Sequence, residues 1–244
     1  MIKKLKFFYD KLYRKNKFMP SAIGIFTNPS YFIRKGLYDT ILLNKKYMKG
    51  LLLDFGCGNK PYKELFEVNE YIGVDMVESG HNHKNENIDV YYDGKILPFQ
   101  DNHFDSIFSS EVFEHIFNLD EILKELYRVL KTDGYILITI PFVWNEHEVP
   151  YDCSRYTSFG INHILEKSGF EIISQHKTTN FVETIFQMWN IYISESFLPS
   201  RISFKKAILI LFLIAPFTIL GLILSKILPK NNSFYNNIVI LAKK

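Results

Sequence analysis

The chain has 244 residues and is 47% hydrophobic and 23% charged, which excludes a disordered protein. This length suits one sizeable α/β domain with an extension, or two small domains. A net charge of +3 gives no reason to expect a nucleic-acid partner. Cys57 and Cys153 match no metal-binding spacing, so we expect reduced thiols and a cytoplasmic protein. The N-terminus lacks the continuous apolar stretch and cleavage site of a secretory signal, and we expect none.

Residues 1–20 are predicted to form a basic amphipathic helix. Residues 1–18 carry seven Lys and Arg residues against one acid. At about 100° per residue, six apolar side chains share one face: Ile2, Leu5, Phe8, Tyr9, Leu12 and Tyr13. This pattern suits an anionic membrane surface, but it equally suits a helix that docks its apolar stripe on the protein's own core.

Strand and helix patterns alternate after this region. A helix is expected at 29–47, followed by strands at 51–55, 71–75, 89–93, 104–109 and 135–140, with helices at 61–67, 111–116, 119–131 and 157–168. Short apolar strands separated by helices predict a doubly wound α/β sheet whose ligand lies at the carboxyl ends of the strands. Further strands are expected at 170–178 and 235–242. We therefore expect a core domain over 21–180, completed by a last strand within 233–244.

The first strand runs into a glycine-rich loop, LLLDFGCGNKPY, at residues 51–62. Gly56 and Gly58 let the backbone approach a ligand where a Cβ would clash. Asp75 ends the second strand, where its two carboxylate oxygens can hold both hydroxyls of a ribose. Asp54 suggests a cationic group nearby, such as an amino-acid ammonium. A nicotinamide dehydrogenase is disfavoured, because Lys60-Pro61 stands where its third glycine and free helix N-terminus would be.

Together with later segments, this loop resembles the class I S-adenosylmethionine-dependent methyltransferases of the broad type 11 group. The resemblance rests on LLLDFGCGNKPY, YIGVDM, YYDGKILPFQDNHFDSIFSSEVFEHI and ELYRVLKTDGYILITIP. It implies a Rossmann-like seven-stranded sheet with an antiparallel last strand, and S-adenosyl-L-methionine as the cofactor. The cofactor-binding residues that it implies are Asp54, Gly56 and Gly58 at the methionine end, Asp75 at the ribose, Met76, Asp93 and Gly94 at the adenine, and Ser110 beneath the cofactor.

Glu111, Glu114 and His115 stand at i, i+3 and i+4, so a helix would bring them onto one face. The pattern resembles quinone-pathway O-methyltransferases, in which it implies a divalent cation, and two carboxylates and an imidazole could ligate one. Many relatives keep Glu-His with no metal role evident from the motif. We therefore expect no metal, and a quinone-type O-methyltransferase with a divalent metal stays as an alternative.

The segment PFVWNEHEVPYDCSRYT, residues 141–157, is expected to roof the acceptor pocket. It resembles methyltransferases of bacterial cell-surface polysaccharide and glycolipid pathways. His147 is the candidate base, because its ordinary pKa suits proton transfer, and Arg155 suits an anionic acceptor. Asp152 and Tyr156 complete the candidate catalytic group. In the alternative, Asp152 and Arg155 form a pair that pins the loop, and Tyr156 anchors the next helix.

Residues 181–232 are expected to form an apolar insert before the last strand. Ala207–Leu224 carries no charge and would be about 27 Å long as a helix, close to the thickness of a bilayer's hydrocarbon core. The strands on either side must pair in one sheet, so the chain must return to the side that it left. With Pro216 near its middle, residues 203–228 are predicted to form a re-entrant or interfacial hairpin between flanking cations. A helix pair that covers an open side of the sheet, or a dimer interface, is the alternative.

These patterns lead to the hypothesis of a methyltransferase that methylates an oxygen of a lipid-linked saccharide or another amphipathic acceptor. It would work as a peripheral or monotopic protein on the cytoplasmic face of the cell membrane. The expected partners are the acceptor and an anionic membrane surface, with no nucleic acid. A catalytically weak, membrane-tethered protein with a methyltransferase-like fold is a further alternative. The acceptor, the methylated atom and the oligomeric state stay open.

Overall fold

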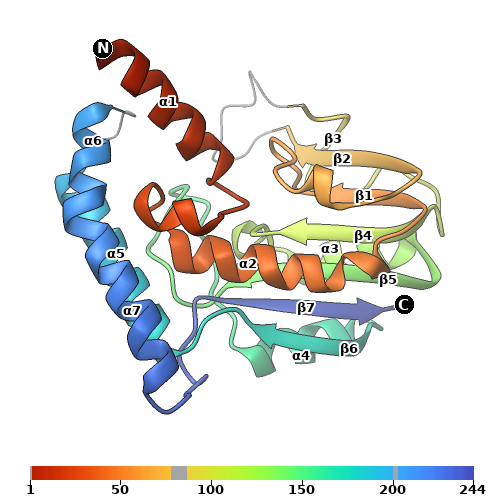
Figure 1. Ribbon diagram of the computed structural model, residues 1–244. Helices are drawn as coiled ribbons and strands as arrows, with labels where there is room; N and C mark the ends of the chain where they lie inside the picture. The colour runs from red at the N-terminus through yellow and green to blue at the C-terminus, as the bar shows by residue number, and fades with distance from the viewer. Residues whose placement is uncertain (1, 78–86, 200–202) are drawn as a thin grey trace. The chain divides into compact units, whose positions relative to one another are not determined.

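The computed structural model describes residues 2–77, 87–199 and 203–244 (Figure 1). The chain forms two compact units. Residues 40–176 and 237–244 make up a sheet unit, and residues 1–39 and 177–236 make up a helical unit. This division corrects the expected core of 21–180, because residues 21–39 belong to the helical unit. The side chain of Gln187 explains why: it donates to the carbonyl of Pro29 and accepts from the N–H of Ile33.

The sheet unit contains a seven-stranded sheet in the order β3-β2-β1-β4-β5-β7-β6. Its strands are β1 (Leu51–Phe55), β2 (Glu70–Met76), β3 (Val90–Tyr92), β4 (Phe104–Ser110), β5 (Leu130–Pro141), β6 (Glu171–Lys177) and β7 (Asn237–Lys243). Strands β3, β2, β1, β4 and β5 pair in parallel, whereas β7 is antiparallel to β5, as the arrows in Figure 1 show. The expected doubly wound sheet with an antiparallel last strand is confirmed. Its strand order reverses between β1 and β4, where ligands bind in such folds.

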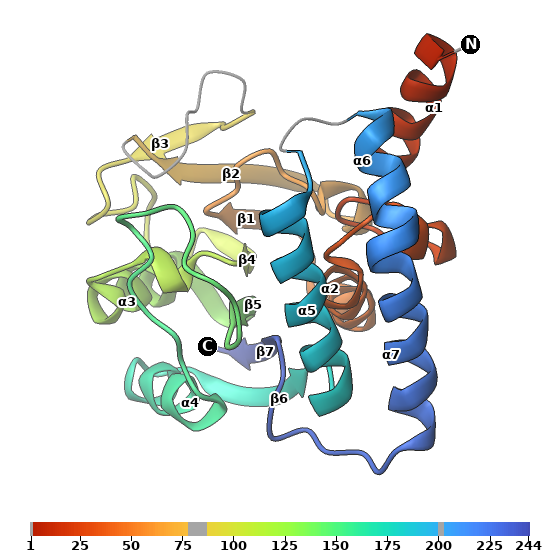
Figure 2. The ribbon, with the colours of Figure 1, turned by 90° about the vertical axis from the view of Figure 1, so that its left-hand side faces the viewer.

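Two helices, α3 (Leu119–Val129) and α4 (Ser158–Lys167), lie on one face of the sheet (Figure 2). The buried stripe of α3 repeats at helical spacing and consists of Leu119, Ile122, Leu123, Leu126 and Val129. Helix α4 begins after Thr157, whose side chain accepts the N–H of Gly160 as an N-cap. Both helices were expected, with ends that differ by one or two residues.

Two other predicted helices do not form. The segments 61–67 and 111–116 contain only single 3-10 turns, η3 (Lys63–Leu65) and η5 (Phe113–His115). Lys60 and Glu111 adopt positive φ angles of 50° and 58°, which an α-helix does not allow. The backbone therefore turns sharply where the spacing of side chains predicted a helix.

The helical unit holds α1 (Ile2–Lys15), the 3-10 turn η1 (Ala22–Phe26), the first part of α2 (Tyr31–Asn44), and α5 (Phe181–Phe197). It ends with α6 (Phe204–Leu209), the π-turn η6 (Ile210–Ile214) and α7 (Ala215–Ile227), which follow one another without a break. The 3-10 turn η2 (Lys45–Tyr47) follows α2 in the sheet unit. Helices α5 and α7 lie side by side in Figures 1 and 2 and contact each other.

The predicted hairpin at 203–228 is wrong, because residues 204–227 form one helix. Pro216 lies inside this helix, directly after the π-turn and Ala215, and the wider hydrogen-bond pattern of the π-turn accommodates a residue without an N–H. Arg201, one of the expected flanking cations, lies outside the described residues.

Helix α1 was predicted to be amphipathic, and its described apolar residues face the helical unit. Tyr9 is buried with Ile193, Ile210 and Ile214, and Tyr13 packs against the same cluster. These contacts favour docking on the protein's own core for this part of α1. The side chains of residues 2–8 lie outside the described structure, so the orientation of Ile2, Leu5 and Phe8 stays a prediction.

Candidate active site

The glycine loop after β1 meets Asp75 at the end of β2, as predicted. The N–H of Gly58 donates to one carboxylate oxygen of Asp75 at 2.8 Å, and the N–H of Met76 donates to the other at 2.8 Å. A carboxylate oxygen can accept more than one hydrogen bond, which is compatible with the predicted contact to a ribose hydroxyl. Gly56 has a φ of 71°, and a Cβ there would lie 2.4 Å from a methyl carbon of Val112. At Gly58 a Cβ would meet open space, so this glycine serves the turn through its φ of 44°.

Asp54 and Lys60 lie beneath this loop. The hydroxyl of Tyr71 donates to the Asp54 carboxylate at 2.5 Å, and burial raises the pKa of Asp54 to about 7. The Lys60 ammonium is buried 2.5 Å from Asp89, which also accepts the N–H of Gly73. Lys60 therefore links the loop to the sheet and does not begin a helix. The predicted contact of Asp54 with a cofactor ammonium stays a prediction.

A cavity of about 400 Å³ lies at the carboxyl ends of β2 and β3. Its lining residues are Met76, Val77, Tyr92, Asp93 and Tyr151. The volume is in the range of small-molecule sites, about 300–1,000 Å³. Met76 and Asp93, predicted at the adenine, are thus brought together, and a Cβ on Gly94 would lie 3.0 Å from the Met76 methyl carbon.

Tyr92 and Tyr151 are lining residues that sequence reasoning missed. Tyr92 ends β3, and Tyr151 comes from the loop after β5, far along the chain. The alternation of buried and exposed residues in a three-residue strand is too short to indicate Tyr92. Tyr151 stands in the segment expected to cover the acceptor, and only the folded loop brings it to this cavity.

Ser110 and Glu111 take part in a hydrogen-bond network at the ends of β4, β5 and β7. The Thr139 hydroxyl donates to Glu111 at 2.8 Å and lies 2.8 Å from the Ser110 hydroxyl, which must then be the donor to Thr139. The side-chain amide of Asn237 donates to the other Glu111 oxygen at 2.6 Å. These bonds hold Glu111 at its positive φ, a conformation that costs about 1–2 kcal/mol. The predicted contact of Ser110 with the cofactor stays a prediction.

The expected alignment of Glu111, Glu114 and His115 on one helix face is wrong. Because no helix forms, Glu111 turns to Thr139 and Asn237, and His147 from the loop after β5 takes the place beside Glu114 and His115. One metal-ligating atom from each of Glu114, His115 and His147 lies within 4.8 Å of the others. The two imidazole rings have their centroids 4.8 Å apart and meet edge to face. We call these three residues the Glu-His-His cluster.

Burial dominates the electrostatics of the Glu-His-His cluster. Glu114 is fully buried, and neither of its carboxylate oxygens has a hydrogen-bond partner among the described residues. Burial, and then the charge of Glu111, raise the pKa of Glu114 well above its ordinary value. Burial lowers the pKa of His115, which favours its neutral imidazole.

Three of the predicted catalytic residues, His147, Asp152 and Arg155, form a connected group. Asp152 accepts the backbone N–H of His147 at 3.1 Å, and its carboxylate lies 3.3 Å from Nδ1 of that histidine. Arg155 donates to both Asp152 oxygens, at 2.5 and 2.7 Å. Burial raises the pKa of Asp152, but the hydrogen bonds from Arg155 and from the His147 N–H outweigh it and lower that pKa overall.

The bidentate pair of Asp152 and Arg155 has the geometry of the loop-pinning alternative, because the Arg155 guanidinium is directed at Asp152. Tyr156 is half-buried directly before the N-cap residue of α4. The roles of Arg155 and Tyr156 toward an acceptor stay predictions.

Both histidines of the cluster are oriented through Nδ1. That nitrogen lies 3.1 Å from the Tyr151 carbonyl in His115 and 3.3 Å from the Asn145 carbonyl in His147. A carbonyl only accepts, so Nδ1 carries the proton in each ring and Nε2 keeps its lone pair. The cluster thus offers two lone pairs and a carboxylate, which suit the acceptance of a proton or the ligation of a cation.

Comparison with known proteins agrees with this geometry. Residues 53–138 match a family model described as a methyltransferase domain. A protein of Methanocaldococcus jannaschii, described as uncharacterised, is 29% identical over 142 residues, which cover 56% of this chain and 49% of that protein. The chain therefore matches about half the length of this relative.

Several solved structures share the fold. A methyltransferase dependent on S-adenosylmethionine from Archaeoglobus fulgidus has a TM-score of 0.54 at 20% identity, over 94% of this chain and 97% of that one. Phosphoethanolamine N-methyltransferase 2 of Haemonchus contortus, in complex with S-adenosyl-L-methionine, has a TM-score of 0.52 at 19% identity, over 95% and 60%. The [4+2]-cyclase SpnF has a TM-score of 0.54 at 17% identity, over 88% and 83%. Proteins with this fold thus have more than one activity, so the methyl acceptor has to be inferred from this chain's own residues.

Proposed function

From the premise that the chain is a class I S-adenosylmethionine-dependent methyltransferase, we propose that it methylates an oxygen of a lipid-linked saccharide or another amphipathic acceptor at the cytoplasmic face of a membrane. One observation carries this proposal. Beside its own apolar core, the helical unit exposes many large apolar side chains and buries several polar ones, which is unusual for a protein surrounded only by water.

The helix from α6 to α7 displays this exposure most clearly. Its exposed apolar side chains include Leu211, Phe212, Leu220, Ile223 and Ile227. Its buried side carries Ile210 and Ile214 and then, farther along the helix, small or polar residues, among them Thr218, Gly221 and Ser225. Helices that pack inside a bilayer commonly meet through such small and hydroxyl-bearing residues.

Helix α5 has the same character. The buried side chain of Asn190 donates to the Thr218 hydroxyl at 2.9 Å, which ties α5 to α7. Trp189 and Tyr192 are exposed on α5. Tryptophan and tyrosine are enriched at membrane–water interfaces, because their rings are apolar at one end and polar at the other.

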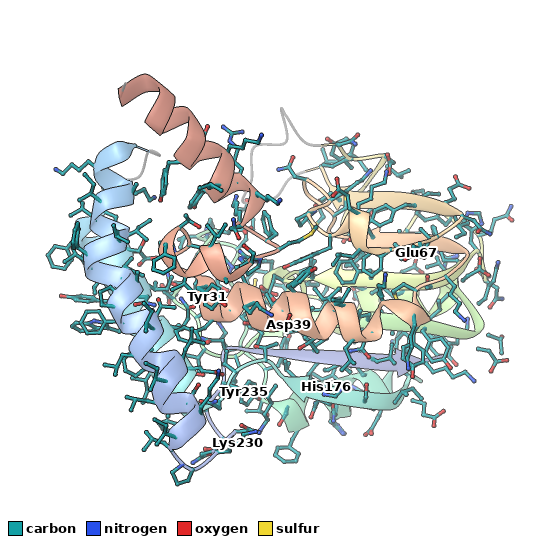
Figure 3. All side chains as sticks on the ribbon, viewed as in Figure 1. Tyr31, Asp39, Glu67, His176, Lys230 and Tyr235 are labelled. Atoms are coloured by element: carbon teal, nitrogen blue, oxygen red, sulfur yellow. The ribbon has the colours of Figure 1, made fainter. Side chains whose placement is uncertain are left out.

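The length and the topology of this region favour an interfacial position. Lys205–Ile227 is long and apolar enough to cross a bilayer, and only 28% of its most apolar stretch is buried. Strands β6 and β7, on either side of the insert, are neighbours in one sheet. The chain therefore leaves and returns on the same side, which disfavours a single crossing. Exposed Lys205 and Lys226 lie in the first and last turns of this helix, and exposed Lys230 follows it (Figure 3); these cations suit anionic headgroups.

An acceptor that resides in a membrane is reached most directly by an enzyme on the same surface. Methyl transfer moves the sulfonium methyl to the acceptor oxygen, breaks the S–CH₃ bond and releases the hydroxyl proton. Alignment of the reactants supplies much of the rate, and a nearby base takes the proton. Glu114, His115 and His147 offer groups that can accept this proton, and Asp152 orients His147.

Vesicle flotation tests the membrane part of the proposal. The full chain should float with vesicles that contain anionic lipid and float less with zwitterionic ones. The variant Phe212→Ser should weaken flotation, whereas Phe159→Ser, at an even more exposed phenylalanine on α4, should not. Equal flotation of both variants and the wild type, or none for any of them, would contradict the membrane position.

Labelled S-adenosylmethionine tests the acceptor. Incubation with a bacterial membrane extract should place the label in a lipid-extractable saccharide, as an alkali-stable methyl ether. Label only in water-soluble products would contradict a lipid-linked acceptor. Label in a quinone would favour the quinone-type alternative.

A further inference from the structure

We propose that Glu114, His115 and His147 form a binding site for a divalent transition-metal ion. The site lies within the sheet unit, where η5 meets the loop after β5. Its donor set is two imidazole nitrogens and one carboxylate. It differs from the set that the sequence suggested, because His147 replaces Glu111.

The ligating atoms are close enough for one ion. They lie within 4.8 Å of one another, and Nε2 of His115 lies 3.7 Å from Oε1 of Glu114. In a tetrahedral Zn²⁺ site with bonds of about 2.0–2.2 Å, two ligating atoms lie about 3.3–3.6 Å apart, so these atoms must approach one another by at most about 1.5 Å. Small side-chain rotations therefore suffice to close the site.

Both histidines have the surroundings of metal ligands. A ligating histidine usually donates its other N–H to a carbonyl or carboxylate, which fixes the tautomer and the orientation of the ring. Here the Tyr151 carbonyl serves His115, and the Asn145 carbonyl and Asp152 carboxylate serve His147. In each ring Nε2 is left with a lone pair.

Glu114 supplies an independent indication. It is fully buried, yet both of its oxygens lack a hydrogen-bond partner among the residues described. Buried carboxylates normally have partners, and a bound cation would provide one. Among the residues described, Arg155 has a guanidinium near Glu114, but its two terminal nitrogens pair with Asp152 and its buried Nε donates no hydrogen bond to Glu114.

The backbone holds the two ligand-bearing segments together. The carbonyl of Glu114 accepts the N–H groups of Cys153 and Ser154 at 2.8 and 3.1 Å. Glu148 adds a carboxylate 3.8 Å from Nε2 of His115 and is a candidate fourth ligand. The backbone therefore holds the ligand-bearing segments together before any ion arrives, and only the side chains have to adjust.

The donor set selects the class of metal. Imidazole suits zinc, iron, cobalt and nickel, whereas magnesium and calcium prefer oxygen ligands throughout. When bound, such an ion would supply Lewis-acid chemistry to an acceptor hydroxyl near the methyl donor. His147 would then hold the ion through Nε2, and its role as a free base would belong to the metal-free protein.

Metal titration of the full chain tests the site without acceptor, vesicles or methyl transfer, so its failure is separate from that of the proposed function. After chelator treatment and dialysis, Co²⁺ should bind at one ion per chain with visible d–d absorption, and Zn²⁺ should displace it. Glu114→Gln and His147→Gln should each weaken binding at least 100-fold. Asp152→Asn, which acts through His147, should weaken it about 10- to 100-fold.

His176→Ala is the matched control, because this histidine is exposed on β6 (Figure 3), and it should bind Co²⁺ as the wild type does. Binding of S-adenosylhomocysteine by each variant shows that the fold survives. Zn²⁺ should also raise the melting temperature of the wild type and not that of Glu114→Gln. Absence of Co²⁺ binding by the wild type, or unchanged binding in folded Glu114→Gln and His147→Gln, would overturn the proposal.

Discussion

In the sheet unit, α3 turns Leu123 and Leu126 inward, whereas in the helical unit α7 turns Leu220 and Ile223 outward and Thr218 inward. Both helices are rich in leucine and isoleucine, but α3 also carries five charged residues and α7 only one. The difference lies in what each helix has to contact. Helix α3 covers a sheet and buries its apolar stripe, while α7 meets α5 through small and polar residues and leaves its apolar residues free for another apolar phase.

Truncation of one leucine in each helix tests this difference most directly. Leu123→Ala should lower the free energy of unfolding by about 2–5 kcal/mol, because the side chain is fully buried and leaves a cavity. Leu220→Ala should change it by less than about 1 kcal/mol in solution, because 44% of this side chain is exposed. Chemical denaturation of both variants measures the difference. Equal losses would mean that the apolar face of α7 is covered in the protein alone.

The next largest effect concerns the ligand of the sheet unit. Asp75→Ala should weaken S-adenosylhomocysteine binding about 100-fold or more, through loss of hydrogen bonds to an ionised carboxylate. Flotation with anionic vesicles should not change, since the residue belongs to the sheet unit. Calorimetric titration measures the affinity, and Asp39→Ala, at an exposed acid of α2 (Figure 3), is the control. An unchanged affinity for Asp75→Ala would refute the ribose assignment.

A pH effect is expected from the buried Asp54. Its pKa is about 7 in the folded chain, against about 3.9 when unfolded. Between about pH 4 and 7 the folded chain keeps a proton that the unfolded chain has lost, so the free energy of unfolding falls as the pH rises. The slope from this group is at most about 1.4 kcal/mol per pH unit. Denaturation curves across this window should be flatter for Asp54→Asn, and an identical slope would argue against a raised pKa.

The smallest expected effect concerns the attraction of the helical unit to an anionic membrane. Removal of Lys226 and Lys230 should weaken binding to anionic vesicles about fivefold for each residue, since a cation near such a surface contributes about 1 kcal/mol. The double variant Lys124→Ala/Lys167→Ala removes two exposed cations of the sheet unit and should bind as the wild type does. Co-sedimentation at low and physiological salt measures both. If Lys226→Ala/Lys230→Ala and Lys124→Ala/Lys167→Ala lose affinity equally, the attraction depends on net charge alone.

Much of the sheet unit could be predicted from local patterns. The strands β1, β2 and β4 are short apolar runs, and the glycine loop and Asp75 follow them at the expected ends. The prediction of a helix at 111–116 failed because side-chain spacing does not reveal the positive φ at Glu111, and residues 61–67 form only one 3-10 turn. The prediction of a hairpin at 203–228 failed because the π-turn before Pro216 lets the helix continue through the proline.

The candidate site divides in the same way. Asp75, Met76 and Asp93 follow strand ends, so their meeting at one edge of the sheet could be foreseen. Tyr151 and His147 come from an irregular loop, and their positions depend on hydrogen bonds to η5 that no periodicity predicts. Glu111 lies in the expected motif but bonds to Asn237, a residue 126 positions away.

The strands of the sheet, the glycine loop after the first of them and the apolar character of residues 207–224 could all be predicted from the sequence alone. These are properties of neighbours along the chain, set by side-chain size, polarity and backbone freedom. Two contacts are visible only in the tertiary structure. Asn190 bonds to Thr218 inside the helical unit, and His147 lies beside Glu114 and His115. Those contacts join residues that are distant along the chain, and the choice among such pairings is made by the packing and hydrogen bonding of the whole fold.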